Sequence, residues 1–430
     1  MTLREKARAV FDAALRASGV GPLVRQALAG LDLPSRGRVL VVGAGKASGA
    51  MAAAAEEALG DRVVAGVVAV KDGHLAPTRR VRLLEAGHPV PDQRGADAAR
   101  AIRDLAASAT ADDLVLVLIS GGGSALTPAP APPITLAEKQ AFTRLLLRAG
   151  ADIKQLNAVR KHVSTLKGGQ LARAAAPARV EALLLSDVNG DPLDVIASGP
   201  TAPDDSTFAE AMRILDRFDI RDQVAPSIVT RLQQGIEGKI AETPKPGDPL
   251  FERVRNRIIG NNTVVVDAAA AAARTLGLTP LVLTRTLEGE AVDVGRRFAA
   301  MARDLKAGRG PVAPPCCVIA GGETTVTVRG QGNGGRCQEL ALAAAIELEG
   351  LTGAVVLAAG TDGSDGPTTA AGAIADGESA RRARAAHVDL AARLADNDSH
   401  AALEPLGDLL LTGPTNTNLL DLYLIVVEPE

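Results

Sequence analysis

The segment RVLVVGAGKAS, residues 38–48, joins an apolar run to a glycine turn and then to a helical pattern that continues to Leu59. The same order returns at 114–124, where LVLVLI runs directly into SGGGS, and at 180–191, where VEALLL ends at SDVNGD. Runs that are apolar at nearly every position are typical of strands buried on both faces in a parallel sheet. We therefore predict an α/β fold with a Rossmann-like, doubly wound parallel sheet in the N-terminal half.

The chain has 430 residues, enough for about two domains at roughly 100–200 residues each. Segment 242–248, ETPKPGD, concentrates proline, glycine and charge and is the predicted linker. Strand-like runs then resume at 257–260, 281–284, 317–320, 324–328, 354–359 and 423–427. We place an N-terminal domain at 1–248 and a second α/β domain at 249–430. The alanine run 268–273 is predicted to be the interior of a helix that begins near residues 261–263.

Composition excludes several classes of protein. The formal net charge is −3, and the chain has no Trp, one Tyr and six Phe, so it lacks both the basic surface and the stacking residues of a nucleic-acid binder. Three cysteines do not make a disulfide framework. Thr2 and Glu5 have capping-box spacing, which predicts an amphipathic N-terminal helix instead of a signal peptide. No apolar run is long enough for a membrane span, so we expect a cytoplasmic protein without a membrane partner.

Two loops of the first half are candidate anion sites, because ligands of open α/β sheets bind at the carboxyl ends of the strands. Gly45 and Lys46 open a helix, where a lysine is unfavourable unless an anion binds beside it; a solvated lysine is the alternative. The loop Ser120, Gly121, Gly122, Gly123 and Ser124 could offer backbone N–H groups to a phosphate or carboxylate, and a flexible turn is the alternative.

Two further segments carry polar side chains. Residues 154–169 are predicted to form a helix with Asn157, Arg160, Ser164 and Lys167 along one stripe, facing either a phosphate or solvent. Asp187 and Asp191 follow another strand, where paired carboxylates suit Mg²⁺ held with phosphate oxygens, although an Asx turn competes. Segment 198–201, SGPT, could bend back to the same loops.

The second half repeats this pattern. Arg336, at a glycine-rich helix start, has the chemistry to hold an anion with two hydrogen bonds. The other polar candidates there follow strand-like runs or lie near the C-terminus: Glu323, Thr361, Asp362, Asn416 and Asn418. Together with the loops of the first half they predict a phosphate-binding cleft shared by the two domains.

The motifs taken together resemble the class II glycerate 2-kinases, the family whose C-terminal half is called the MOFRL domain and some of whose members are named hydroxypyruvate reductases. The resemblance rests on motifs that run in order from about residue 40 to 421: VVGAGKASGAM, GHPVPD, ISGGGSAL, LNAVRKHVSTLKGG, LLSDVNGDPLDVIASGPT, GGETTVTV, GGRCQELALA, AAGTDGSDGPT and GPTNTNLLDL. Cys337 stands where the family pattern has Asn, and Asn189 where Pro is commoner.

The resemblance implies two α/β domains with the active site in a cleft between them. It implies ATP- and Mg²⁺-dependent phosphorylation of D-glycerate at the 2-hydroxyl, giving 2-phosphoglycerate. Lys46 and Arg336 match the family's functional lysine and arginine, and we expect them to bracket the phosphoryl group and the glycerate carboxylate. Asp187, Asp191 and Asp362 stay open as candidates for the base. The expected partners are therefore D-glycerate and ATP, with no nucleic acid and no membrane, and a homodimer stays open.

Two other functions stay open at this point. An NAD(P)H-dependent hydroxypyruvate reductase would use the GxG after the first strand to bind a dinucleotide, but would leave Lys46 and Arg336 without a phosphate to bind. A sugar-phosphate-binding regulator would bind ligand without turnover and would tolerate loss of the paired aspartates.

Overall fold

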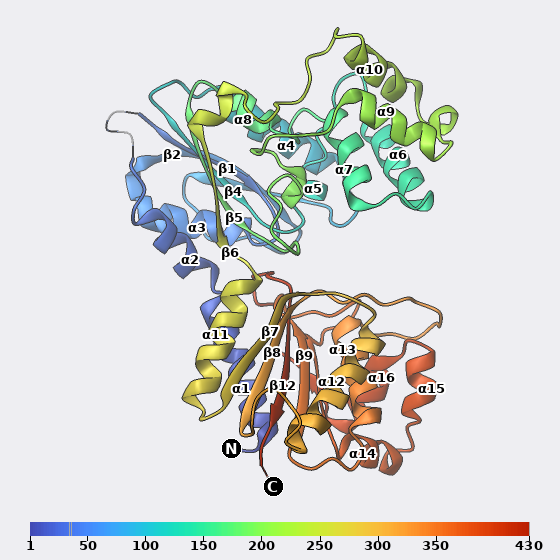
Figure 1. Cartoon of the computed structure of the whole chain (residues 1–430). Coiled ribbons are helices and arrows are strands. Elements are labelled where there is room, and N and C mark those ends of the chain that lie inside the picture. The colour runs from blue at the N-terminus through green and yellow to red at the C-terminus, as the bar shows by residue number, and fades with distance from the viewer. Residues whose placement is uncertain (34, 36, 430) are drawn as a thin grey trace. The chain divides into compact units, whose positions relative to one another are not determined.

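The computed structural model describes residues 1–33, 35 and 37–429. The chain forms two compact units (Figure 1): the first is Val20–Ile259, and the second combines Met1–Gly19 with Gly260–Glu430. These limits differ from the predicted division at 248/249, because the N-terminal helix packs in the second unit and the strand at 254–260 completes the sheet of the first. No helix in the described ranges has the length and apolar character that crossing a membrane requires.

The first unit is built on a six-stranded sheet with the order β3-β2-β1-β4-β5-β6. Its strands are β1 (Val39–Ala44), β2 (Val63–Lys71), β3 (Val81–Ala86), β4 (Leu114–Ile119), β5 (Arg179–Leu185) and β6 (Val254–Gly260). The pairings from β3 to β5 are all parallel, and β1 and β4 are buried along their whole length. The predicted parallel sheet is confirmed.

Helices cover this sheet on both faces and form a separate cluster beside it (Figure 1). The helices are α2 (Val20–Leu28), α3 (Ser48–Leu59), α4 (Gln93–Ala107), α5 (Gly123–Leu126), α6 (Leu136–Arg148), α7 (Ile153–His162), α8 (Gln170–Ala175), α9 (Phe208–Arg217) and α10 (Pro226–Ile236). The helices α4 and α8 pack on the face of Leu40 and Val42, whereas α2 and α3 pack together on the other face. The cluster of α6, α7, α9 and α10 has its own apolar core around Phe142 and Phe208.

The predicted linker 242–248 lies inside the first unit. The Thr243 hydroxyl donates to Asp204 Oδ2 at 2.8 Å, and the Asp204 N–H donates to the carbonyl of Pro244 at 2.9 Å. These bonds fix the segment before β6. The proline and glycine there belong to a loop within the first unit. The run 257–260 is part of the first sheet, so the prediction that it starts a second domain was wrong.

The second unit has a mixed six-stranded sheet with the order β11-β10-β9-β12-β8-β7. Its strands are β7 (Thr279–Leu287), β8 (Cys316–Gly322), β9 (Ala354–Gly360), β10 (Gly372–Asp376), β11 (Leu409–Leu410) and β12 (Asp421–Val427). Only β7 and β8 pair in parallel; β12 runs antiparallel between β8 and β9. The predicted strand at 324–328 does not form. In this segment Thr325 makes only an isolated bridge, to Glu290.

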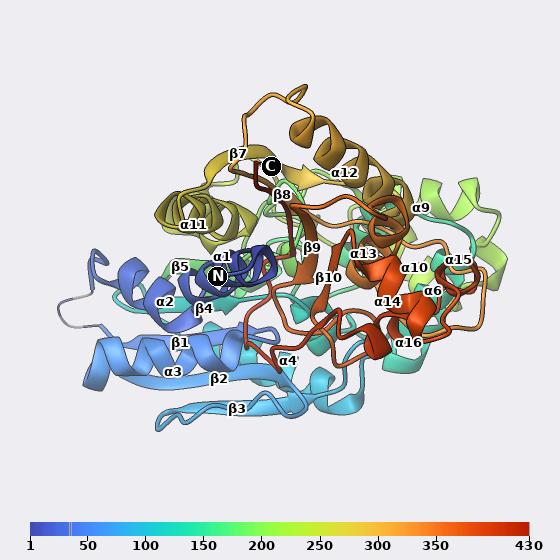
Figure 2. The ribbon, with the colours of Figure 1, turned by 90° about the horizontal axis from the view of Figure 1, so that it is seen from below.

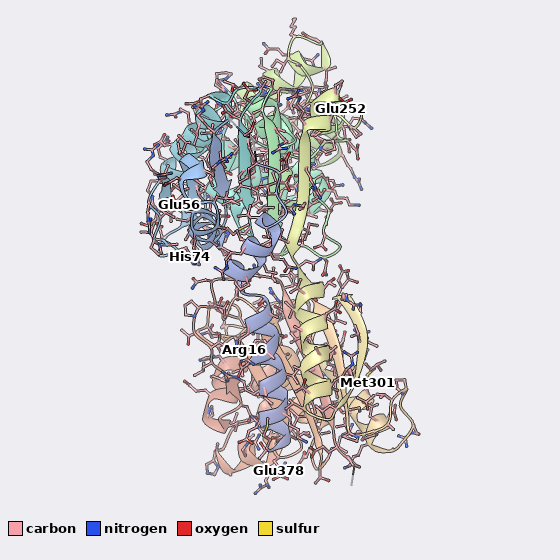
Figure 3. The ribbon with its side chains drawn as sticks, turned by 90° about the vertical axis from the view of Figure 1, so that its left-hand side faces the viewer. Arg16, Glu56, His74, Glu252, Met301 and Glu378 are labelled. Atoms are coloured by element: carbon pink, nitrogen blue, oxygen red, sulfur yellow. The ribbon has the colours of Figure 1, made fainter. Side chains whose placement is uncertain are left out.

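Two layers of helices enclose this sheet. They are α1 (Leu3–Ala17), α11 (Asn262–Thr275), α12 (Ala291–Lys306), α13 (Arg336–Glu347), α14 (Ser379–Ala385), α15 (Leu390–Ala395) and α16 (Ser399–Leu403). Figure 3 shows α1 beside α11 on one face, and Figures 1 and 2 show α12 and α13 on the other. The predicted start of the alanine-rich helix is confirmed, because Asn261 caps α11 by accepting the N–H of Thr263.

The N-terminal helix α1 forms with the predicted capping box between Thr2 and Glu5. Val10 and Phe11, on its apolar stripe, are fully buried. Arg4 on the same helix forms ion pairs with Asp376 at 2.6 Å and Asp408 at 2.8 Å. The apolar face of α1 is therefore part of the second unit.

Candidate active site

The structure brings three of the predicted loops together at one edge of the first sheet. The strands β1, β4 and β5 are neighbours and parallel, so the loops that follow them begin side by side. The N–H of Lys46 donates to the carbonyl of Gly121 at 2.9 Å. A Cβ on Gly121 would lie 2.0 Å from Asp187 Oδ2, so this carboxylate rests directly against the glycine backbone. Lys46, the SGGGS loop and Asp187 therefore form one cluster, which we call the glycine-loop site.

Two glycines make this close approach possible. Gly45 has φ +150°, and a Cβ there would lie 2.0 Å from the hydroxyl of Ser120. Gly122 has φ +84°, and a Cβ there would lie 3.0 Å from the ring of His88 and 3.4 Å from Lys46 Cγ. Gly122 thus lies between the side chains of Lys46 and His88, and any larger residue would push them away.

The imidazole of His88 is neutral at neutral pH. Burial, together with the nearby positive charges of Lys46 and Lys71, lowers the pKa of His88 to about 4. His88 was absent from the predicted phosphate site, although the GHPVPD motif that contains it contributed to the resemblance. In this position it adds no charge beside Lys46 and offers only a neutral ring.

Ser120 has a structural contact of its own. Its hydroxyl accepts the N–H of Ala47 at 3.0 Å and lies 3.0 Å from the hydroxyl of Ser48 at the start of α3. Ser120 is 2% exposed. It joins the first two loops together, which holds Lys46 at the helix start.

The segment 198–201 returns to the glycine loop as predicted. The hydroxyls of Ser124 and Ser198 lie 2.9 Å apart, and Ser198 also donates to Asn157 Oδ1 at 3.1 Å. Ala197 and Ser198 have φ angles of +50° and +63°, which L-residues adopt at a cost, and such strain is concentrated at functional sites. Ser124 and Asn157 are thereby brought together with the other predicted residues of the first unit.

The predicted polar stripe on residues 154–169 is only partly correct. The helix α7 ends at His162, so Ser164 and Lys167 lie on the turn after it. Arg160 lines a small cavity, and its buried Nε has no hydrogen-bond partner among the described residues. Neither a solvated face nor a continuous helical stripe describes this segment.

Asp187 precedes a tight turn after β5, and Asp191 closes that turn. The Asp191 N–H donates to the carbonyl of Val188 at 3.1 Å, and Asp191 has φ +56°. In the part of the chain that the structure describes, no three His, Cys, Asp or Glu side chains gather in a group that could hold a metal ion. Mg²⁺ bound with phosphates commonly uses only one or two carboxylates, which is a donor set that Asp187 can supply beside the glycine loop.

In the second unit, Arg336 is held by two carboxylates. Its Nε and Nη2 donate to the two oxygens of Asp421 at 2.6 and 3.0 Å, and its Nη1 lies 2.8 Å from Glu323 Oε1. Asp421 is 1% exposed and also accepts the hydroxyl of Tyr423 at 2.9 Å. Although burial opposes the charge, these bonds raise the pKa of Arg336. Sequence reasoning missed Asp421, whose only signal was a single acid before the apolar run LYLIVV.

Thr361 connects the loop after β9 to the segment before β12 by hydrogen bonds. Its hydroxyl donates to the carbonyl of Leu420 at 2.7 Å and accepts the N–H of Leu419 at 2.8 Å. Thr361 is fully buried, so it fixes the loop instead of facing a ligand.

The remaining predicted residues of these loops differ in their contacts. Asp362 caps its own turn through the N–H of Ser364 at 3.0 Å. Asn418 accepts the N–H of Leu420 at 3.4 Å, and Asn416 is exposed in a left-handed conformation with φ +58°. The two loops lie side by side within the second unit.

Asp365 binds the start of α13, which carries Arg336. Its carboxylate accepts the N–H groups of Cys337 at 3.2 Å and Gln338 at 2.8 Å. Burial and the charge of Asp421 together raise the pKa of Asp365 to about 6, against the lowering effect of these hydrogen bonds. The folded protein therefore binds this proton more tightly than the unfolded chain does.

Stability should consequently depend on pH through Asp365. Its contribution is fully present below about pH 4, the unfolded pKa, and is lost as the pH rises through about 6, which amounts to roughly 3 kcal/mol. Asp365→Asn removes the charge and keeps one oxygen, which can still accept one of the two N–H groups. We expect the variant to become more stable relative to the parent between pH 4 and pH 7, measured as the difference in thermal midpoints. A difference that is constant over this range would contradict the shift.

Comparison with known proteins identifies the family. A family model described as "Domain of unknown function (DUF4147)" matches residues 6–233, and one described as "MOFRL family" matches residues 316–421. A D-glycerate 2-kinase of Thermotoga maritima is 43% identical over 93% of this chain and 93% of its own. The chain belongs to the class II glycerate 2-kinase family.

The fold agrees with this assignment. A crystal structure of a Thermotoga maritima glycerate kinase superposes with a TM-score of 0.92 at 42% identity, and covers 99% of each chain. An Agrobacterium vitis relative, 42% identical over 99% of this chain and 95% of its own, carries a provisional hydroxypyruvate reductase name. Membership of the glycerate 2-kinase family is therefore shown over the whole chain, and the names within the family cover two chemistries.

Proposed function

We propose that this chain catalyses transfer of the γ-phosphoryl group of ATP to the 2-hydroxyl of D-glycerate, giving 2-phosphoglycerate. The observation that carries the proposal is the glycine-loop site, where Lys46 projects beside Gly122 and Asp187 rests on Gly121. Phosphoryl transfer needs positioning and neutralisation of charge more than covalent help, and a lysine beside two glycine-rich loops supplies both. The names of the relatives support the same chemistry.

In this proposal the glycine-rich loops position the phosphoryl group, and Lys46 neutralises its negative charge. The Lys46 N–H is fixed on Gly121, so its ammonium group starts from a rigid backbone. Asp187 would hold Mg²⁺, which supplies additional charge for the phosphate oxygens when bound. The predicted part of Arg336 in binding the phosphoryl group stays a prediction, because its guanidinium is already paired with Asp421 and Glu323.

The reductase alternative has one observation in its favour, the name of the Agrobacterium vitis relative. It gives no purpose to Lys46, just before α3, because the dinucleotide fingerprint assigns no role to a cation at that position. It also needs a proton donor, and His88 is a poor one because burial lowers its pKa to about 4.

A pair of assays on the purified protein separates the two functions. The first supplies D-glycerate, ATP and Mg²⁺, follows ADP release and identifies the product by ³¹P NMR as 2- or 3-phosphoglycerate. The second supplies hydroxypyruvate with NADH or NADPH and follows absorbance. We expect ADP release with 2-phosphoglycerate and no oxidation of the dinucleotide. Oxidation of NAD(P)H without ADP release would overturn the proposal.

A further inference from the structure

A small cavity lies beside the glycine-loop site within the first unit. It encloses about 180 Å³ and is lined by Ser124 of the loop, Lys139 and Arg144 of α6, Arg160 of α7, and apolar residues that include Leu136 and Pro89. No acidic side chain of the described residues lines it. Pockets for drug-sized ligands occupy about 300–1,000 Å³, so this cavity suits a small acid and not a nucleotide.

Two buried lysines, Lys139 and Lys167, and the half-buried Arg160 lie at or beside this cavity, whereas Arg144 is exposed. Lys139 is 4% exposed, and its ammonium group donates to the carbonyl of Pro128. Lys167 is 1% exposed and donates to the carbonyl and hydroxyl of Ser124 at 2.9 and 3.0 Å. Within the described ranges, no acidic side chain acts on either lysine or on Arg160, and Arg160 Nε has no hydrogen-bond partner. The three groups therefore lack the negative charge that buried cations require.

The positive charges of these groups act on one another. Burial lowers the pKa of Lys139 well below its ordinary value, and the charge of Arg160 lowers it further. Burial also lowers the pKa of Lys167 well below its ordinary value, and the charges of Lys139 and Arg160 lower it too. A bound anion would relieve all three repulsions together.

Ser124 connects the cavity to the proposed reaction site. Gly122 and Ser124 are two residues apart, so their Cα atoms lie within about 7 Å of each other. Gly122 contacts the side chain of Lys46, and Ser124 lines the cavity. One end of a short hydroxy acid in the cavity would therefore leave its other end near the glycine loop.

We propose that Lys139 and Arg160 bind the carboxylate of the acceptor in this cavity, with Lys167 adding charge from behind Ser124. The proposal rests on the proposed function and extends it, because it assigns the residues that select a hydroxy acid over a neutral alcohol. Ser124 orients Lys167, and the apolar wall from Leu136 and Pro89 excludes water from the ion pair.

The test uses Lys139→Met and Arg160→Met, with Arg148→Met as the control. Arg148 is an exposed cation on the same helix as Lys139, outside the cavity lining. We expect the KM for D-glycerate to rise on the order of 10–100-fold in both variants, the usual effect of losing a hydrogen bond to a charged group. The KM for ATP should change less than about twofold. Arg160→Lys, which keeps the charge, should recover part of the loss.

Two inhibitors probe the carboxylate itself. 3-Hydroxypropionate keeps the carboxylate but lacks the 2-hydroxyl, and its neutral amide lacks both. We expect the acid to compete with D-glycerate in the unchanged protein, and its inhibition constant to rise in the two variants in parallel with KM. The amide should inhibit weakly and equally in all of them. If Lys139 had a purely structural role, Lys139→Met would keep the parental preference for the acid over the amide.

Each outcome decides a different point. Removing a buried cation that lacks an ionic partner should not destabilise the fold, so both variants are expected to remain folded. Turnover with an unchanged KM for D-glycerate, a rise in the KM for ATP instead, or equal inhibition of the unchanged protein by acid and amide would overturn this inference alone. Absence of turnover by the unchanged protein would overturn the proposed function and this inference with it.

Discussion

Replacing Lys46 by alanine is expected to lower kcat/KM for D-glycerate about 10²–10³-fold, the usual cost of removing one preorganised charge from a transition state. The side chain is half-buried beside Gly122 and forms no ion pair among the described residues. Its contact with Gly121 uses the backbone N–H, which alanine keeps. The fold should therefore be retained, with the thermal midpoint within about 2 °C of the parent.

The matched control is Lys154→Ala, which removes an exposed lysine from the first turn of α7. Both variants change the net charge equally. A loss of activity in Lys46→Ala alone would therefore be due to the position of Lys46 and not to the change in net charge. The measurement is initial-rate ADP release at several D-glycerate and ATP concentrations. If Lys46→Ala kept more than about a tenth of the parental kcat/KM, its assignment to the phosphoryl group would be wrong.

The sequence predicted that the residues of the glycine-loop site lie together, because they follow adjacent parallel strands. Continuous apolar runs identified β1, β4 and β5, and the ends of such strands meet at one edge of the sheet. Lys46, Ser124 and Asp187 could thus be grouped before any contact was known. Sequence reasoning also anticipated that segment 198–201 returns to this edge, since Ser198 contacts Ser124.

The residues that the sequence did not reveal depend on long-range packing. Lys139 lies in a helical segment where a lysine normally faces solvent, and only the tertiary fold buries it. Asp421 precedes an apolar strand, and only the pairing of β12 beside β8 brings it to Arg336. The division into units failed for the same reason, because neither the edge position of β6 nor the docking of α1 has a local sequence signal.

Arg336→Met is expected to lower both stability and activity, whereas Lys46→Ala is expected to lower activity alone. The substitution leaves Asp421, which is 1% exposed, with a buried charge and no cation, a loss of about 3–5 kcal/mol. For a domain of this size that corresponds to a fall of about 10 °C in the thermal midpoint of the second unit. Loss of activity in this variant would therefore not distinguish a ligand contact from a structural ion pair.

The double variant Arg336→Met with Asp421→Asn makes that distinction. Without the carboxylate no buried charge is left unpaired, and the asparagine oxygen can still accept the hydroxyl of Tyr423, so most of the lost stability should return. Asp421→Asn alone keeps Arg336 and its contact with Glu323 and should retain most of the activity. We expect the double variant to be stable and at least about 10²-fold less active, because a guanidinium that binds the phosphoryl group has no substitute. A stable double variant with near-parental kcat/KM would instead show that Arg336 serves only as the ionic partner of Asp421.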